Sequence, residues 1–487
     1  MKHNLMTSKW FAPLFWTQFL SAFNDNLVKN TLIFLILFQL SAEEAGAMVT
    51  IASAVLILPF LFFSAIGGEI ADKYDKGKVA ERLKFVEIGA AIVAVTGIAL
   101  SSIPILMIAL FLFGFVSALF GPVKYGILPD HIETYALPKA NAWVEAGTFL
   151  AILGGTIVAG IAFDGEAGIW VFGPMMMVFS ISCWIFSRYI PQTGPAEPEL
   201  QIDRNILRST IRLLKELKQD NRIFHAAWMV SWFWVIGAIV LSLMPTFVKQ
   251  TLGGHEIAVT AYLAIFAIFI GIGSALAAWM SAGRINLILA PIGTFLLAVF
   301  LTDLSIVLWN LEPQTPVNTL REFFAKDNTI HIAIDLAGLA IAGAFLVVPT
   351  FTAVQAWAPV KNRARIVAAV NVLNSLFIVT GIAIIAGLQA AGIGIATLLI
   401  ALGVINLIVA VLMLIYLPTN PLRDFISVIL RAFHRMEVEG LENVEKAGDA
   451  PIIALNHVSY LDGGLALALT DKDPMFAVDA KVAQNGG

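Results

Sequence analysis

The chain contains 487 residues, of which 59% are hydrophobic and 13% are charged, with a formal net charge of -4 at pH 7. Soluble chains are about half apolar and a quarter charged, so this composition and the mean hydropathy of +0.85 exclude a soluble globular protein. The small net charge says little about partners, and we expect no nucleic-acid partner. The one cysteine, Cys183, excludes an intrachain disulfide, and we expect neither a metal site nor a cofactor.

Apolar runs of about 20 residues recur along the chain, which is the length that a helix needs to cross a bilayer, whereas barrel strands are about half as long. We therefore expect an all-α polytopic membrane protein with about twelve spans. They are predicted near residues 10–40, 46–67, 83–101, 103–121, 141–163, 168–190, 223–248, 257–280, 286–309, 330–356, 365–389 and 394–417.

Lysine and arginine concentrate in the loops that follow every second span. The loop after the second span is assigned five of them, Lys73, Lys76, Lys78, Arg82 and Lys84. The intervening loops carry few basic residues. Because basic loops stay in the cytoplasm, this alternation predicts a multi-pass inner-membrane protein with both termini cytoplasmic.

A polar cluster interrupts the first span at Asn24, Asp25, Asn26, Lys29 and Asn30. A charge at the centre of a membrane helix is unfavourable by a few kcal/mol or more, so it usually faces a partner or a polar cavity. Asp25 and Lys29 are four residues apart on one helix face. Two interpretations follow: a self-neutralising pair that lets the helix insert, or a wet, substrate-facing site in a transporter.

The segment 191–222 is the longest basic loop between spans and divides the chain into two halves. Apolar residues within 202–217 recur at helical spacing between basic ones, which indicates either a helix on the anionic inner leaflet or a solvated tether. We expect five parts: a six-helix bundle (1–190), a cytoplasmic linker (191–222), a second six-helix bundle (223–417), an amphipathic linker (418–435) and an α/β segment (436–487).

The loop after the second span holds glycines, an acid and lysines at fixed spacing. Glycine allows helices to approach closely, and an acid at a helix end can bind a neighbouring helix N-terminus. Gly68, Asp72, Lys73 and Lys76 resemble the cytoplasmic loop motif of the major facilitator superfamily, whereas Asp75 departs from it. The resemblance implies that these four are gating residues, in two six-helix bundles that rock about a central cavity.

Several stretches together resemble the bacterial lysophospholipid transporter branch of that superfamily. They are residues 19–26, 122–128, 139–146 and 345–349. The resemblance implies transport of lysophospholipid, chiefly lysophosphatidylethanolamine, from the outer to the inner leaflet of the bacterial inner membrane. It also implies that Asp25 is the charged position of the first span. The centre of the seventh span, 233–241, is wholly apolar.

A lysolipid needs an acid for its ammonium, donors for its phosphate and an apolar slot for its chain. Asp25 suits the ammonium, and Glu145 is a candidate cavity or gate residue. Gly121-Pro122 should end the fourth span, which leaves Lys124 and Tyr125 at the cytoplasmic mouth. The other candidate donors are Asn24, Asn26, Lys29, Gln355, Asn371 and Asn374. For the amides, hydrogen bonding between helices is an equal alternative. Glu87 and Asp303 are expected to be structural.

Near the end of the sequence, the buried-strand pattern 451–455 precedes Asn456, His457 and Asp462. The His-x4-Asp spacing resembles the catalytic motif of glycerolipid acyltransferases. The resemblance implies that His457 is a base for a substrate hydroxyl and that Asp462 orients it. We expect the inactive opening of a fused acyltransferase domain, followed beyond residue 487 by the rest of that domain. An acyl-carrier-protein-dependent acyl activation domain is a further candidate there.

Two other functions fit parts of this pattern. One is a proton-coupled exporter of amphipathic drugs, in which Asp25 and Glu145 would carry protons. The other is an acyltransferase whose helices only anchor it in the membrane. Twelve spans with a loop motif and an intramembrane acid exceed what anchoring needs, so the lysophospholipid transporter is the favoured interpretation.

Overall fold

The computed structural model describes residues 5–40, 42–163, 168–203, 205–281, 284–317, 319–434, 452, 454 and 462–469. These residues are helical, with a single isolated β-bridge between Gly254 and Val317 and no strand among them. The prediction of an all-α membrane fold is confirmed. The predicted α/β segment is not seen in the described residues, which form helix α17 (Asp462–Leu469) there, while His457 lies outside them.

In the described part of the chain, twelve helices of 20 to 32 residues form the bundle. The first group is α1 (Ala12–Gln39), α2 (Ala42–Lys73), α3 (Lys76–Ala99), α4 (Ile103–His131), α5 (Leu137–Phe163) and α6 (Gly168–Ser187). The second is α8 (Asn221–Gln250), α9 (Glu256–Ser281), α10 (Leu289–Trp309), α12 (Thr329–Trp357), α13 (Arg363–Ala390) and α14 (Ile395–Ile415). Within the described residues, nine helices are long and apolar enough to cross a membrane.

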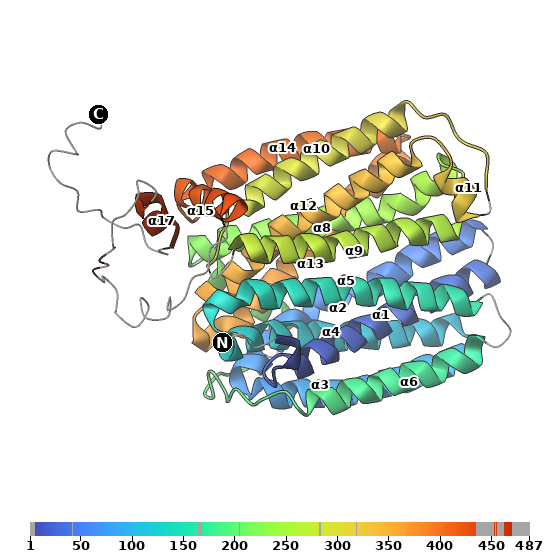
Figure 1. Ribbon diagram of the computed structural model, residues 1–487. Coiled ribbons are helices and arrows are strands. Elements are labelled where there is room, and N and C mark those ends of the chain that lie inside the picture. Colours follow the sequence, from blue (N-terminus) through green and yellow to red (C-terminus); the bar gives the residue numbers. More distant parts are fainter. Residues whose placement is uncertain are drawn as a thin grey trace, which may run out of the picture.

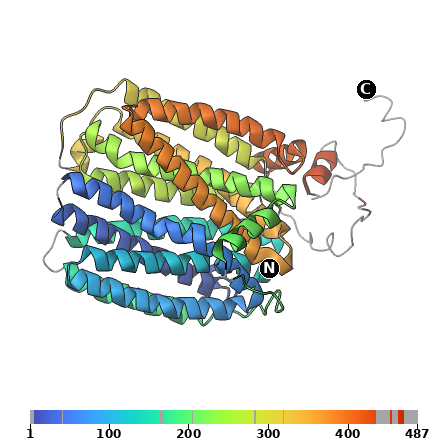
Figure 2. The ribbon, with the colours of Figure 1, turned by 180° about the vertical axis from the view of Figure 1, so that it is seen from behind.

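The two groups lie side by side as two layers of the bundle (Figures 1 and 2). They meet where α2 packs against α13 and where α5 packs against α9, and further contacts join α4 to α13 and α5 to α12. Small residues permit the closest of these approaches. A Cβ atom on Gly68 of α2 would lie 2.6 Å from the Cβ of Ala368 and 2.9 Å from the carbonyl oxygen of Ala364, both on α13.

We call the end of the bundle that carries Lys73, Lys76 and Lys78 the basic end. The short helix α15 (Pro421–Phe433) lies there and packs against α9, and α11 (Leu320–Phe324) lies at the opposite end (Figure 1). Helix α7 (Ile206–Leu217) packs against α2 and α13. The helical spacing predicted within 202–217 is confirmed; Leu213 and Leu217 are 1% exposed against the bundle, whereas Leu207 and Ile211 are exposed, and the leaflet placement stays a prediction.

Helix α4 does not end at Gly121-Pro122, as predicted, but continues through Pro122 and Pro129 to His131. A proline removes one backbone donor and can stay inside a membrane helix when neighbouring groups satisfy the freed carbonyl. Lys124 and Tyr125 therefore belong to a helix that packs against other helices.

Candidate functional site

Asp25 lies in the middle of α1 and is half-buried. Its Oδ2 accepts a hydrogen bond from the Ser117 hydroxyl of α4 at 2.7 Å, while Oδ1 is buried and has no hydrogen-bond partner among the described residues. Lys29 is half-buried one turn away, and among the described residues it forms no ion pair with Asp25. Asp25 and Lys29 therefore do not neutralise each other, and the alternative of a self-neutralising pair is wrong.

A second polar group is formed by α4 and α5. The Tyr125 hydroxyl donates a hydrogen bond to Oε1 of Glu145 at 3.1 Å, and the Lys124 ammonium lies 4.4 Å from the centre of the Tyr125 ring. Glu145 is 2% exposed, and within the part of the chain that the structure describes its Oε2 is buried without a hydrogen-bond partner. An unmatched carboxylate oxygen of this kind is unfavourable unless a donor reaches it, so Glu145 is poised to accept one from a ligand.

A third charged group was missed in the sequence. Lys84 was assigned to a loop, but α3 begins at Lys76, and both Lys84 and Glu87 are fully buried. The Lys84 ammonium binds Glu87 at 2.5 Å and the Ser21 hydroxyl of α1 at 2.7 Å, and it lies 3.9 Å from the centre of the Phe120 ring. The signal was present in the Lys-x-x-Glu spacing of an apolar segment, which places both side chains on one helix face.

These groups form one electrostatic assembly. Asp25 interacts with Glu87, Lys84 and Lys124, and Lys124 also interacts with Glu145. Acidic and basic side chains from α1, α3, α4 and α5 are therefore mixed in one region. A site with both signs of charge in a low-dielectric setting suits a ligand that is itself zwitterionic, since each ligand charge can meet its opposite.

The predicted amides divide into two kinds. Asn24 donates hydrogen bonds to Ser180 and to the carbonyl of Met176 on α6, which makes it a helix-packing residue. Asn26 bonds the carbonyl of Ala22 in its own helix. Hydrogen bonding between helices, the alternative given for the amides, therefore describes Asn24, and the contacts of Asn374 and Gln355 given below are of the same kind.

Two amides come from α13 in the second group. Asn374 accepts a hydrogen bond from Ser231 of α8 at 2.7 Å and is mostly buried. The Asn371 amide nitrogen faces α4, only 2.7 Å from where a Cβ atom on Gly121 would stand. Gly121 is one helical turn from Ser117, the partner of Asp25. Asn371 therefore brings the second group of helices to the polar site of the first.

Gln355 and Asn141 join the two groups of helices. The Asn141 amide donates to Oε1 of Gln355 at 2.6 Å and to the Thr352 hydroxyl at 3.0 Å. Gln355 in turn donates to the backbone carbonyl of Tyr125 at 3.1 Å. Gln355 is fully buried in this contact, so the structure places it in the seam between the groups rather than beside Asp25.

Asp72, at the basic end of α2, binds the N-terminus of α13. Its two carboxylate oxygens accept the backbone N–H groups of Ala364 at 3.0 Å and Arg365 at 3.1 Å, and the Arg365 guanidinium at 3.1 Å. The exposed N–H groups and dipole of a helix N-terminus favour an anion. A second acid also joins the two groups of helices. Asp130 of α4 forms ion pairs with the side chains of Lys76 at 2.8 Å and Arg363 of α13 at 2.7 Å.

Glu197, in the connection that follows α6, extends this set of contacts. It binds Lys361 at 2.9 Å and also Arg365. Burial alone would raise the pKa of Glu197, but the hydrogen bonds and charges of Lys361 and Arg365 outweigh burial and hold its pKa below the ordinary value of 4.5. Lys73, the remaining residue of the loop motif, lies 5.8 Å from the centre of the Tyr74 ring.

The lowered pKa of Glu197 predicts a pH-dependent contribution to stability. A group whose pKa is lower in the folded state stabilises fully above its unfolded pKa and loses that effect as pH falls through the folded value. Glu197→Gln should therefore lower the thermal unfolding midpoint near pH 7, and the gap to the parent protein should close as pH falls below 4.5. Glu199→Gln, at an exposed neighbour, is the control. A gap that persists unchanged in acid contradicts the ion-pair assignment.

An apolar pocket lies in the second group of helices, lined by α8, α9, α10 and α12. The pocket is small, with about 10 Å³ of space for a water-sized molecule, and its lining residues are Phe233, Ile236, Gly237, Val240, Phe266, Leu297, Leu339 and Gly343. The uncharged centre of the seventh predicted span supplies half of this lining. Phe149 of α5 adjoins the pocket, with ring centroids 6.4 Å from Phe233 and 6.0 Å from Phe266.

This fold and its buried charged site define a polytopic membrane transport protein. The chain belongs to the Major Facilitator Superfamily, and the model of that family matches residues 14–311. Solved structures share the fold. The proton:xylose symporter XylE aligns with a TM-score of 0.63 and 15% identity, over 84% of this chain and 95% of XylE. The human organic anion transporter MFSD10 aligns with a TM-score of 0.62 and 12% identity, over 82% and 99%.

Curated relatives include lysophospholipid transporters. The chain is 28% identical over 273 residues to the lysophospholipid transporter LplT of Escherichia coli O139:H28 (strain E24377A / ETEC), which is 56% of this chain and 66% of the relative. The LplT of Shigella boydii serotype 18 (strain CDC 3083-94 / BS512) matches equally. The aligned part thus spans slightly less than two thirds of these relatives, and the chain is a homologue of them within the superfamily.

Proposed function

We propose that this protein transports a lysophospholipid, chiefly lysophosphatidylethanolamine, from the outer to the inner leaflet of a bacterial inner membrane. The homology to lysophospholipid transporters supports the substrate class. The chemistry of the site supports it independently. The free carboxylate oxygens of Asp25 and Glu145 suit the ammonium of the headgroup, and Lys29 and Lys124 suit its phosphate.

One observation carries the proposal. Helix α5 presents Glu145 and, four residues later on the same face, Phe149. Glu145 belongs to the charged site, whereas Phe149 contacts Phe233 and Phe266 of the apolar pocket. One helical turn, about 5.4 Å, therefore separates the charged site from an apolar lining, and in our proposal this lining opens to take the acyl chain. A single-chain amphiphile has this same polarity, and a free sugar or ion lacks its apolar part.

Movement of the substrate would use alternating access between residues 1–190 and residues 223–417, with 191–222 as the linker. The ion pairs of Asp72 and Asp130 with α13, and of Glu197 with Arg365, hold the basic end together. In our proposal the basic end is cytoplasmic, as the loop charges favour, so Gly68, Asp72, Lys73 and Lys76 belong to the cytoplasmic gate, and this conformation receives lipid from the outer leaflet.

The test is leaflet transfer by the purified full chain in phosphatidylglycerol–phosphatidylcholine vesicles. Headgroup-labelled lysophosphatidylethanolamine should move faster than in protein-free vesicles, and diacyl phosphatidylethanolamine should not. Equal rates with and without protein would reject the proposal. Transport of an amphipathic drug that follows an imposed pH gradient, without lysolipid transfer, would instead establish the exporter.

We also propose that residues 436–487 begin a glycerolipid acyltransferase domain that would reacylate the transported lipid on the same side of the membrane. The support is the sequence pattern alone, His457 followed by Asp462. Asp462 is the first residue of α17, which packs against α15. Isolation of the gene with its flanking sequence, followed by an acyl-transfer assay of the full product with and without His457→Ala, tests this part.

A further inference from the structure

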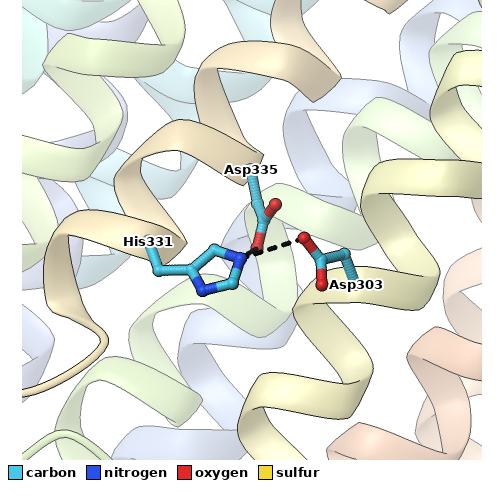
Figure 3. Close-up of side chains that lie close together, drawn as sticks. All are labelled: Asp303, His331 and Asp335. Atoms are coloured by element: carbon cyan, nitrogen blue, oxygen red, sulfur yellow. Dashed lines mark hydrogen bonds and ion pairs between the residues drawn. The ribbon is translucent and has the colours of Figure 1, made fainter.

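Three side chains that the transport site does not use converge between α10 and α12 (Figure 3). Asp303 comes from α10, and His331 and Asp335 come from the first two turns of α12, which follows α11 at the end opposite the basic end. His331 Nε2 lies 2.9 Å from Oδ2 of Asp303 and 4.0 Å from Oδ2 of Asp335. One ligand atom from each residue lies within 4.8 Å of the others.

Asp335 is the buried member of this cluster. It is 1% exposed, and its buried Oδ2, which points at His331 and Asp303, meets the distance and angle criteria of a hydrogen bond with no group in the described part of the chain (Figure 3). An ionised carboxylate buried in this way is strongly unfavourable unless a positive charge or a hydrogen bond reaches it. His331 compensates this charge only in part, because its Nε2 hydrogen-bonds Asp303 and stands 4.0 Å from Oδ2 of Asp335. A cation held among the three side chains would supply the remaining positive charge.

We propose that Asp303, His331 and Asp335 form a binding site for a divalent transition-metal ion, with Zn²⁺ or Mn²⁺ as the suited class. Ligands about 2.0–2.2 Å from a tetrahedral zinc stand about 3.4 Å apart. The two measured separations from His331 Nε2, 2.9 and 4.0 Å, lie on either side of that value. Opening the first by about 0.5 Å and closing the second by about 0.6 Å would bring both to that value.

The sequence spacing supports this geometry. His331 and Asp335 are four residues apart on α12, which places an imidazole and a carboxylate on one face. Imidazole favours zinc and similar metals, and two carboxylates broaden the site toward manganese. Three protein ligands leave a coordination position for water, and half-exposed Asp303 and His331 give the ion a path from solvent. A bound ion would clamp α10 to α12.

The experiment uses the full chain in detergent, treated with EDTA and desalted, then titrated with Zn²⁺ and Mn²⁺ by calorimetry. One ion per chain should bind and raise the thermal unfolding midpoint. Asp335→Asn and His331→Gln should each weaken binding at least about tenfold. His255→Gln, at another exposed histidine, should leave binding unchanged.

Asp303→Asn provides a second variant at a half-exposed position, in case the buried Asp335 variant fails to fold. Failure of the parent protein to bind either ion would overturn the proposal and leave a proton as the cation shared by these carboxylates. Binding that all three variants retain would place the ion elsewhere and would also overturn it. Neither result bears on lysophospholipid transfer, because Asp25 and Glu145 are not involved.

Discussion

Asp25→Asn should reduce lysophosphatidylethanolamine transfer by about 10- to 100-fold, since a hydrogen bond to a charged group contributes about 1.5–3 kcal/mol. The substitution preserves the shape of the side chain and its contact with Ser117 but removes the negative charge beside the free Oδ1. The lower transfer rate should reflect weaker binding of the headgroup ammonium. Initial rates of leaflet transfer in vesicles, measured against lipid concentration, check this expectation.

Two variants make this result interpretable. Asp25→Glu restores the charge and should recover part of the rate. Glu312→Gln removes an exposed acid of the loop that follows α10 and should leave transfer unchanged. A lysolipid whose headgroup lacks the ammonium should lose less rate in Asp25→Asn than lysophosphatidylethanolamine does. Full transfer activity in Asp25→Asn would remove Asp25 from substrate recognition.

Asp72→Asn should weaken the closed basic end by about 1–3 kcal/mol, a shift of about 5- to 150-fold toward its open state. Asp72 is fully buried and neutralises both the N-terminus of α13 and the Arg365 guanidinium. Asparagine keeps one acceptor but loses the charge. Glu197 continues to hold Arg365, so the contact should weaken rather than disappear.

Electron–electron distances measure this shift directly. Spin labels at Glu133→Cys and Val360→Cys, two exposed positions on opposite groups at the basic end, report the separation of the groups in a Cys183→Ser background. The distance distribution should gain a longer component in Asp72→Asn. Asp75→Asn is the matched control, because Asp75 caps α3 and binds Gly194 without touching α13. An unchanged distribution in Asp72→Asn would show that Asp72 does not hold this end closed.

Much of the fold could be predicted from local sequence. Long apolar runs dictate membrane helices whatever their partners, because lipid leaves the backbone no other means to satisfy its hydrogen bonds. The loop motif similarly indicated Asp72 as an acid for a helix N-terminus, although not which helix. The errors arose where a local rule met a tertiary exception: Pro122 lies inside α4, and Lys84 lies inside α3 rather than in a loop.

Local sequence was enough to show that the chain spans a membrane many times and that Asp25 is an unusual charge within it, because hydropathy and intramembrane charge are properties of single segments. The partners of these side chains emerged from the packing of the helices. Asp25 meets Ser117 and not Lys29, and Gln355 meets Asn141 across the seam. Such contacts depend on helix rotation and on which helices are neighbours, and residues hundreds of positions apart leave no local pattern from which either can be inferred.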